Sequence, residues 1–269
     1  MGWVGPAPPS FLPRPPLSTS SSLCTLKETA KGTDMLATIH LTDGSATDFW
    51  KSTAPEPGET PGLISAQKLT AAPFNGKTVG MPDLGRNGFL GFWESDEAIS
   101  AHLARPESAP LRAGWHVRCV PVRALGRWPG LPDDIERSAE VTWNGPTVGL
   151  SIGPVRATKA VGFNRLNTQV ERQLLTSPGV LWASGMFCPP NMLCSLSFWE
   201  TATHLEAFAR KGAHAEAMQR SLDPDFDPSL PNGTKYFGTD LAFARFRPYL
   251  TAGSPVSYTH LTLPTTSRV

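Results

Sequence analysis

Along Leu193–Trp199, an apolar face of Cys194, Leu196 and Phe198 alternates with a mixed face that includes Ser195 and Ser197. Apolar residues then recur about one helical turn apart until Gly212 interrupts them. The alternation predicts a half-buried strand, and the following spacing predicts a helix with one apolar face. Thr201 is a residue type that caps helix N-termini. The stretch therefore predicts a strand, a short turn and a helix, with His214 in the last segment of the helix.

The same pattern occurs earlier in the chain. Phe92-Trp93-Glu94 recurs 106 positions later as Phe198-Trp199-Glu200, and Pro61-Gly62 is matched upstream of the second copy by Pro178-Gly179. Two copies of a unit much longer than a solenoid repeat indicate two similar domains rather than an array.

The order of predicted elements is the same in both copies. The first predicts strands at 36–41, 63–69, 89–93 and 116–122 with helices at 46–52 and 96–103, the second of which starts at Ser95. The second predicts strands at 148–157, 180–187, 192–199 and 241–246 with helices at 163–175 and 204–221. This order, β-α-β-β-α-β, predicts an α+β protein made of two tandem ferredoxin-like repeats. We expect repeat 1 over residues 35–130, a linker over 131–146 and repeat 2 over 147–250.

Both ends of the chain differ from this pattern. Residues 1–34 are rich in proline and serine, which predicts a disordered leader or an over-extended translation start. Residues 251–269 are expected to form a tail, in which VSYTHLTLPT (256–265) matches the translation of a sequencing-library adapter. A long polar loop at 223–238 predicts a functional lid.

Composition excludes several classes of protein. The 269 residues carry a formal net charge of +1, only 17% of them are charged, and no basic cluster is present, so no nucleic-acid partner is expected. The apolar runs are far shorter than the roughly 20 residues of a membrane span. Of the four cysteines, Cys188 and Cys194 could form a disulfide, but free thiols packed in strands are the favoured interpretation, and they indicate the cytoplasm.

An ordered set of short segments resembles one enzyme family, the spheroidene monooxygenases, over roughly residues 36–249. These segments are Arg156-Ala157-Thr158, Phe198-Trp199-Glu200, Phe208-Ala209, Ala213-His214-Ala215-Glu216-Ala217 and Phe243-Ala244-Arg245-Phe246, with weaker matches in the first half. The resemblance implies two ferredoxin-like halves fused into an intramolecular dimeric α/β-barrel. It also implies a haem-dependent reaction that uses molecular oxygen to convert acyclic carotenoids to keto derivatives.

Oxidation of an unactivated carbon needs a cofactor that activates oxygen. The sequence contains no G-x-G-x-x-G fingerprint, no obvious two-His-one-carboxylate set and no Cys-x-x-Cys-His motif. Two possibilities therefore remain for the cofactor: non-covalent haem held by one histidine, or no cofactor at all. The resemblance singles out His214 as the haem ligand, whereas a histidine on a helix is otherwise a surface or capping residue.

Four further residues are candidates for the site. Arg245 could pair with a haem propionate, or it could be a solvated arginine of an edge strand. Trp93 and Trp199 occupy equivalent positions and, with Phe208, could line a pocket for a long polyene. Core packing is the alternative for both tryptophans.

Two hypotheses about function follow. The first is a spheroidene monooxygenase-like oxygenase with a small apolar substrate, an unidentified electron donor and possible peripheral contact with a membrane. The second is a non-enzymatic protein that uses the same fused barrel to bind haem or another apolar ligand.

Overall fold

The computed structural model describes residues 35–53, 55–76, 81–135, 142–221 and 240–253, all of which belong to one compact unit. The predicted leader (1–34), the predicted lid loop (223–238) and the adapter-like segment (256–265) lie outside the described residues.

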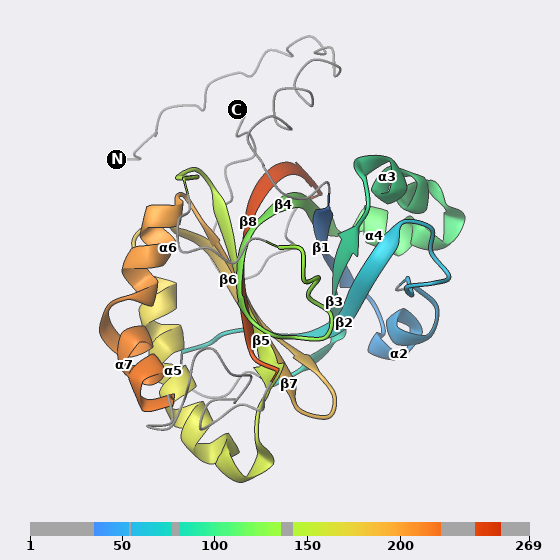
Figure 1. The fold of residues 1–269 in the computed structure, drawn as a ribbon. Coiled ribbons are helices and arrows are strands. Elements are labelled where there is room, and N and C mark those ends of the chain that lie inside the picture. Colours follow the sequence, from blue (N-terminus) through green and yellow to red (C-terminus); the bar gives the residue numbers. More distant parts are fainter. Residues whose placement is uncertain (1–34, 54, 77–80, 136–141, 222–239, 254–269) are drawn as a thin grey trace, which may run out of the picture. The chain divides into compact units, whose positions relative to one another are not determined.

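The first half contains four strands and several short helices (Figure 1). The strands are β1 (Leu36–Asp43), β2 (Leu63–Ala72), β3 (Asp83–Trp93) and β4 (Trp115–Gly126). The helical segments are α2 (Ala46–Asp48), a π-helical turn (Phe49–Thr53), α3 (Asp96–Ala104), a 3₁₀ turn (Pro106–Ser108) and α4 (Ala109–Ala113).

The second half repeats the order with longer helices. Its strands are β5 (Thr147–Pro154), β6 (Val180–Cys188), β7 (Met192–Trp199) and β8 (Ala242–Ala252). Its helical segments are a 3₁₀ turn (Ala157–Lys159), α5 (Ala160–Thr176), α6 (Ala202–Ala209) and α7 (Gly212–Ser221).

All eight strands pair antiparallel, in the closed order β1-β3-β2-β6-β7-β5-β8-β4. Within each half the order is fourth, first, third, second strand, so the halves meet through β2–β6 on one side and β4–β8 on the other. The two seams are unequal. The β2–β6 seam consists of three residue pairs, Thr70↔Phe187 to Ala72↔Gly185, whereas the β4–β8 seam runs from His116↔Ala252 to Gly126↔Ala242.

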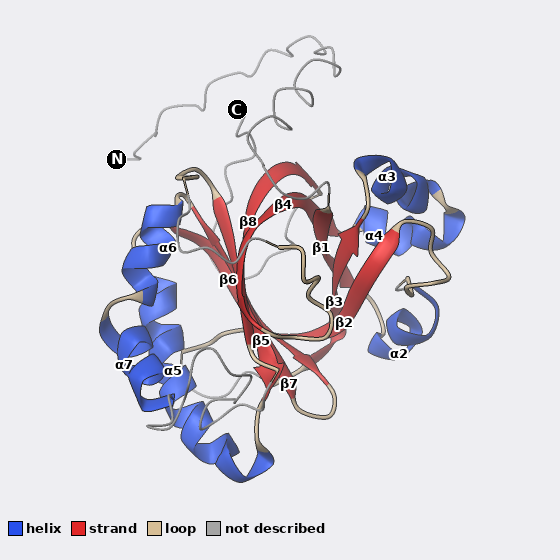
Figure 2. Cartoon of the chain, viewed as in Figure 1, coloured by secondary structure: helices blue, strands red, loops and turns tan. Residues whose placement is uncertain are grey.

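Helices cover the outer face of the sheet in each half (Figure 2). The helices α2, α3 and α4 lie over the first half, and α5, α6 and α7 lie over the second. Strands are therefore buried on both faces. In β1, Ala37, Ile39 and Leu41 belong to the core inside the barrel, while Thr38 and His40 on the other face are also buried.

Three apolar clusters form the core. The largest lies inside the barrel and includes Trp115, Trp182, Phe198 and Phe246. The other two lie between sheet and helices, around Phe89 and Trp93 in the first half and around Trp199 and Phe208 in the second. The segment after β4 adds three buried side chains to the interior cluster, those of Trp128, Leu131 and Ile135.

Local geometry is repeated between the halves. Gly62 and Gly179 both have φ +75°, and their carbonyl oxygens accept hydrogen bonds from Glu94 N (2.9 Å) and Glu200 N (2.8 Å). Ser95 Oγ and Thr201 Oγ1 accept from backbone N–H groups of α3 and α6, which confirms both predicted helix starts.

Some predicted elements differ from the structure. The predicted strand 89–93 begins at Asp83, because this polar stretch pairs with the end of β1 as far as Asp43↔Arg86. The predicted helix 204–221 is wrong as a single helix, because it is broken into α6 and α7 at Gly212, where φ is +58°. The remaining strands and α5 match the predictions to within a few residues, except that β5 ends at Pro154, β4 extends to Gly126 and β8 to Ala252. In the described part of the chain, no helix is both long and apolar enough to cross a membrane.

Candidate functional site

A cavity of about 170 Å³ lies between the sheet and the helices of the second half. Its walls come from β5 to β8 on one side and from α5, α6 and α7 on the other. Two residues of the first half, Ala72 and Phe74, complete the lining. Most of the lining side chains are apolar, which suits an apolar ligand.

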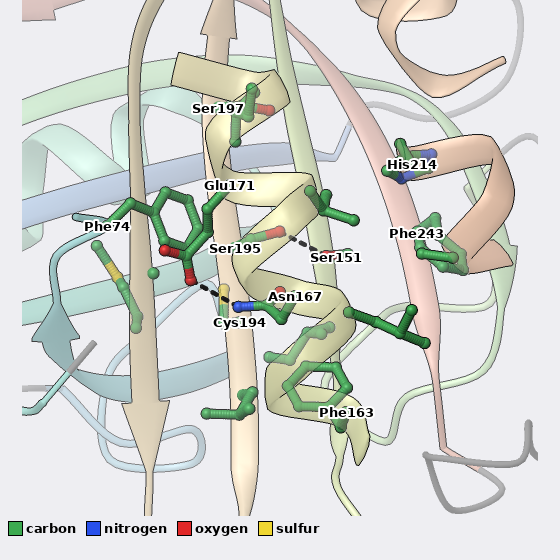
Figure 3. Close-up of a pocket in the computed structure, with 18 of the residues that line it drawn as sticks. Phe74, Ser151, Phe163, Asn167, Glu171, Cys194, Ser195, Ser197, His214 and Phe243 are labelled. Atoms are coloured by element: carbon green, nitrogen blue, oxygen red, sulfur yellow. Dashed lines mark hydrogen bonds between the residues drawn. The ribbon is translucent and has the colours of Figure 1, made fainter. Parts of the chain in front are cut away.

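His214 of α7 lines this cavity (Figure 3), and Phe208 of α6 is also among the lining residues. The His214 Nδ1 atom lies 2.9 Å from the carbonyl oxygen of Ala209. A carbonyl oxygen can only accept, so Nδ1 carries the proton, and Nε2 of the neutral ring keeps its lone pair. Metal-binding histidines commonly donate the other ring N–H to such a carbonyl.

Burial lowers the pKa of His214, and the bond to Ala209 partly opposes that shift. The imidazole is therefore neutral at neutral pH, the state in which it can bind a metal. The ring of Phe208 packs against it, with the ring centroids 4.8 Å apart.

Gln173 of α5 holds the break between α6 and α7. Its Nε2 donates to the carbonyl oxygens of Phe208 (3.2 Å) and Lys211 (3.0 Å), and its Oε1 accepts from His214 N at 2.9 Å. Glycine suits φ +58° at position 212, and a Cβ atom there would lie 2.8 Å from Gln173 Oε1, so a side chain would also displace the Gln173 amide. One side chain of α5 thus fixes the position of the His214 backbone.

The sequence interpretation missed a buried carboxylate in the same cavity. Glu171 is 2% exposed; its Oε1 accepts from Asn167 Nδ2 at 2.6 Å and its Oε2 accepts from Gly76 N at 3.4 Å. Burial raises the pKa of Glu171, against the effect of backbone N–H donors at Gly76 and Asn75. The available signal was a polar pair at i and i+4 on the apolar face of α5.

The opposite wall also carries polar groups. Ser151 and Ser195, paired across β5 and β7, have hydroxyl oxygens 2.6 Å apart, and Figure 3 shows both facing α5. Cys194 lines the cavity as well, but burial raises the pKa of its thiol, so it is not poised as a thiolate ligand. Cys119, Cys188 and Cys194 are free, which confirms the favoured interpretation of the described cysteines.

The other predicted site residues lie outside the cavity lining. Arg245 is on the outer face of β8, and its Nη1 lies 2.7 Å from Glu206 Oε1 of α6. Trp199 is fully buried behind the wall, with its ring 5.2 Å from that of Phe208. Trp93 lies in the other half, where its Nε1 donates to Thr38 Oγ1 at 2.9 Å. The structure therefore brings together two of the five predicted residues, His214 and Phe208, with Trp199 directly behind them.

The residue types of the lining suit a haem group, but a cavity of about 170 Å³ takes only part of a porphyrin ring. If haem were bound here, His214 Nε2 could hold the iron and the apolar walls would suit the ring. Among the described lining residues there is no lysine or arginine, so propionates would have to lie at the edge of the cavity. In the described ranges, no three His, Cys, Asp or Glu side chains form a cluster suited to a metal ion.

Comparisons with known proteins were made on sequence and on structure. No family model matches the chain. Among solved structures, the chain is similar to a monooxygenase-like protein from Listeria innocua (10% identity, 81% of this chain and 95% of that chain, TM-score 0.30). It is also similar to a heme-degrading enzyme from Listeria monocytogenes (10% identity, 78% of this chain and 98% of that chain, TM-score 0.30). A third similar structure is aldoxime dehydratase (7% identity, 80% of this chain and 81% of that chain, TM-score 0.46).

Sequence comparison gives a more specific relative. The chain is 26% identical over 220 residues to the spheroidene monooxygenase of Rubrivivax gelatinosus, which covers 77% of this chain and 84% of that protein. The predicted resemblance to spheroidene monooxygenases is thereby confirmed.

Proposed function

We propose that the protein is a haem-dependent monooxygenase that oxidises a small apolar substrate of the carotenoid type, as its resemblance to spheroidene monooxygenase suggests. The observation that carries the proposal is the geometry of His214. It lines an apolar cavity, and its Nδ1 is bonded to the carbonyl of Ala209, which leaves Nε2 for iron.

We also propose that the two halves are tandem ferredoxin-like repeats that form an intramolecular dimeric α/β-barrel. The repeated strand order, the matched glycine turns and the matched helix caps support this interpretation. Residues 35–130 and 147–250 remain our proposed repeat boundaries. Residues 131–146 remain the proposed linker, although part of that segment packs inside the barrel.

Each described residue of the site has a role in this proposal. When bound, haem supplies the activation of molecular oxygen that no protein side chain can provide. His214 would hold the iron, Gln173 holds the backbone of His214, and the apolar walls would exclude water from the substrate. Glu171, which accepts a hydrogen bond from Asn167, is the group that could hold or move a proton at the cavity wall. The Trp199 ring packs against the Phe208 ring. Arg245 would have to break its ion pair with Glu206 before it could bind a propionate.

Several partners remain part of the proposal. The reaction needs an external electron donor, which the described residues do not identify. Peripheral contact with a membrane also remains part of the proposal, and Val161, which is 86% exposed two residues before the cavity residue Phe163, is a candidate for it. We propose a cytoplasmic location and no nucleic-acid partner.

The test is reconstitution of the purified protein with haem. We expect a Soret band, and haem at a hundredfold excess over Kd should stabilise the fold by about 2.7 kcal/mol. His214→Ala should abolish both effects. The matched control is His204→Ala, because His204 lies on α6 and its Nδ1 is 3.1 Å from Thr201 Oγ1, outside the cavity lining. Equal haem uptake by wild type and His214→Ala would overturn the assignment.

Product analysis then separates enzyme from carrier. The reconstituted protein, given an acyclic carotenoid, oxygen and a chemical reductant, should release a keto product. Haem or carotenoid binding without a product would instead favour the non-enzymatic ligand-binding protein.

A further inference from the structure

Phe74 is a residue of the first half that lies in the cavity of the second. It follows β2, and its ring lies against β6, because position 185 on that strand has no side chain. A Cβ atom at Gly185 would lie 2.9 Å from Phe74 Cε1 and 2.6 Å from the carbonyl oxygen of Ala72. The ring also packs on the apolar cluster around Trp199.

The chain after Phe74 is held in place by α5. The N–H of Gly76 donates to Glu171 Oε2, and the carbonyl oxygen of Gly76 accepts from Arg172 Nε. Glu171 and Arg172, which are consecutive in α5, therefore bind the N–H and the carbonyl oxygen of Gly76. Gly76 is itself buried and has φ +63°. We call these three residues the Gly76 clamp.

The position of Phe74 relative to His214 gives the clamp a consequence for binding. Figure 3 shows Phe74 and Glu171 on one side of α5, and His214 with Phe243 on the other. All four residues line the same cavity. A linear ligand that extends away from His214 along the sheet would therefore meet the Phe74 ring.

We propose that Phe74, fixed by the Gly76 clamp, closes one end of the cavity and determines the length of the linear apolar chain that the protein accepts. The inference rests on the proposed function only in taking the ligand to be a linear apolar molecule. Phe74 is a specificity-determining residue in this proposal, and Arg172, which is exposed and outside the lining, is a positioning residue that acts through it.

The experiment measures binding of straight-chain primary alcohols, from butanol to dodecanol, to the full chain by calorimetry. Each buried methylene group should improve Kd about fourfold until the chain reaches Phe74, after which affinity should stop rising. Phe74→Ala should shift this limit to longer alcohols and leave the Kd of the shorter ones nearly unchanged. If Phe74→Ala does not fold, Phe74→Leu offers a smaller change in the same direction.

Two further variants make the test specific. Arg172→Met keeps the aliphatic stem but removes the donor to Gly76. In the wild-type background it should make the length limit for alcohol binding less sharp or move it to longer alcohols. In the Phe74→Ala background it should change nothing. The control Phe49→Ala removes a buried ring from the cluster around Trp93, outside the cavity, and should leave the limit in place.

An unchanged limit in Phe74→Ala, or an equal loss of affinity for every alcohol, would overturn the inference. Independent effects of Phe74→Ala and Arg172→Met would overturn the role of the clamp. Because the limit is measured by binding alone, absence of oxygenase activity would count against the proposed function without affecting this result.

Discussion

His40 is the most deeply buried titratable residue on the helix side of the first half. Its ring stacks on that of His116 across β1 and β4, with centroids 5.0 Å apart, and one of its nitrogens bonds to the carbonyl of Leu111. Burial, chiefly, and then His116 lower the pKa of His40 to about 3, with smaller contributions from His102 and Arg118. Burial also lowers the pKa of His102 and of His116. All three rings are therefore neutral in the folded protein near neutral pH.

Acid should destabilise the fold through these histidines. Between pH 6.5 and 3 the unfolded chain binds a proton that folded His40 does not, so the free energy of unfolding falls as the pH falls. One such group removes about 1.4 kcal/mol per pH unit, or about 2 kcal/mol by pH 5. Urea unfolding at pH 7.5 and pH 5 should show this loss in wild type, and a smaller loss in His40→Gln. An identical pH dependence in the two proteins would contradict the assignment.

Single residues also mark the limit of prediction from sequence. His214 and Phe208 were found because a family resemblance singled them out, and both line the cavity. Glu171 was missed because a glutamate within an amphipathic helix is usually solvated, and only the fold shows that it faces the sheet. Phe74 was missed because a residue of the first half enters the site of the second only through tertiary structure.

At the scale of elements, the strand-to-helix units around Gly62 and Gly179 are the most closely repeated part of the chain. Each glycine has φ +75°, and each approaches the following helix: a Cβ atom would lie 2.5 Å from Ala98 Cβ in the first unit and 2.2 Å from His204 Nδ1 in the second. These turns were visible in sequence as Pro-Gly pairs. The break at Gly212 was visible as well, but Gln173, which stabilises it from α5, was not.

Gly62→Ala should be strongly destabilising. A left-handed conformation costs an alanine about 1–2 kcal/mol, and the contact with Ala98 adds steric repulsion to that cost. Gly58→Ala is the matched control, because Gly58 has φ +86° and a Cβ atom there would meet nothing within 4 Å. Urea unfolding should therefore show a larger loss for Gly62→Ala than for Gly58→Ala. Equal losses would mean that close packing on α3 does not constrain this turn.

At the scale of the whole described unit, the connection between the halves contributes to the core. Trp128 is 4% exposed inside the barrel, and nearby the Ser65 hydroxyl donates to the carbonyl of Gly130 at 2.6 Å. The sequence predicted a linker over residues 131–146, because the Pro/Gly-rich composition of this part of the chain gives no periodic signal. Closure of the barrel creates an apolar interior that the strands alone do not fill, and no local pattern reveals that.

Trp128→Ala should lower stability by about 3–5 kcal/mol, the usual range for removing a large buried aromatic side chain. The control is Trp143→Ala, because Trp143 is only half-buried and its ring contacts Arg247 at 5.2 Å. A cation–π contact of that kind contributes about 0.5–1 kcal/mol. Similar melting temperatures for the two variants would show that the connection does not stabilise the interior.

The short seam between β2 and β6 couples transient opening of the barrel to occupancy of the cavity. Ala72 and Gly185, the last of its three residue pairs, also line the cavity, and Met186 beside them does so too. A ligand lying against these residues would oppose transient separation of the two strands. Amide hydrogen exchange at 70–72 and 185–187 would then slow together when the cavity fills, although the two segments lie more than a hundred residues apart in the chain.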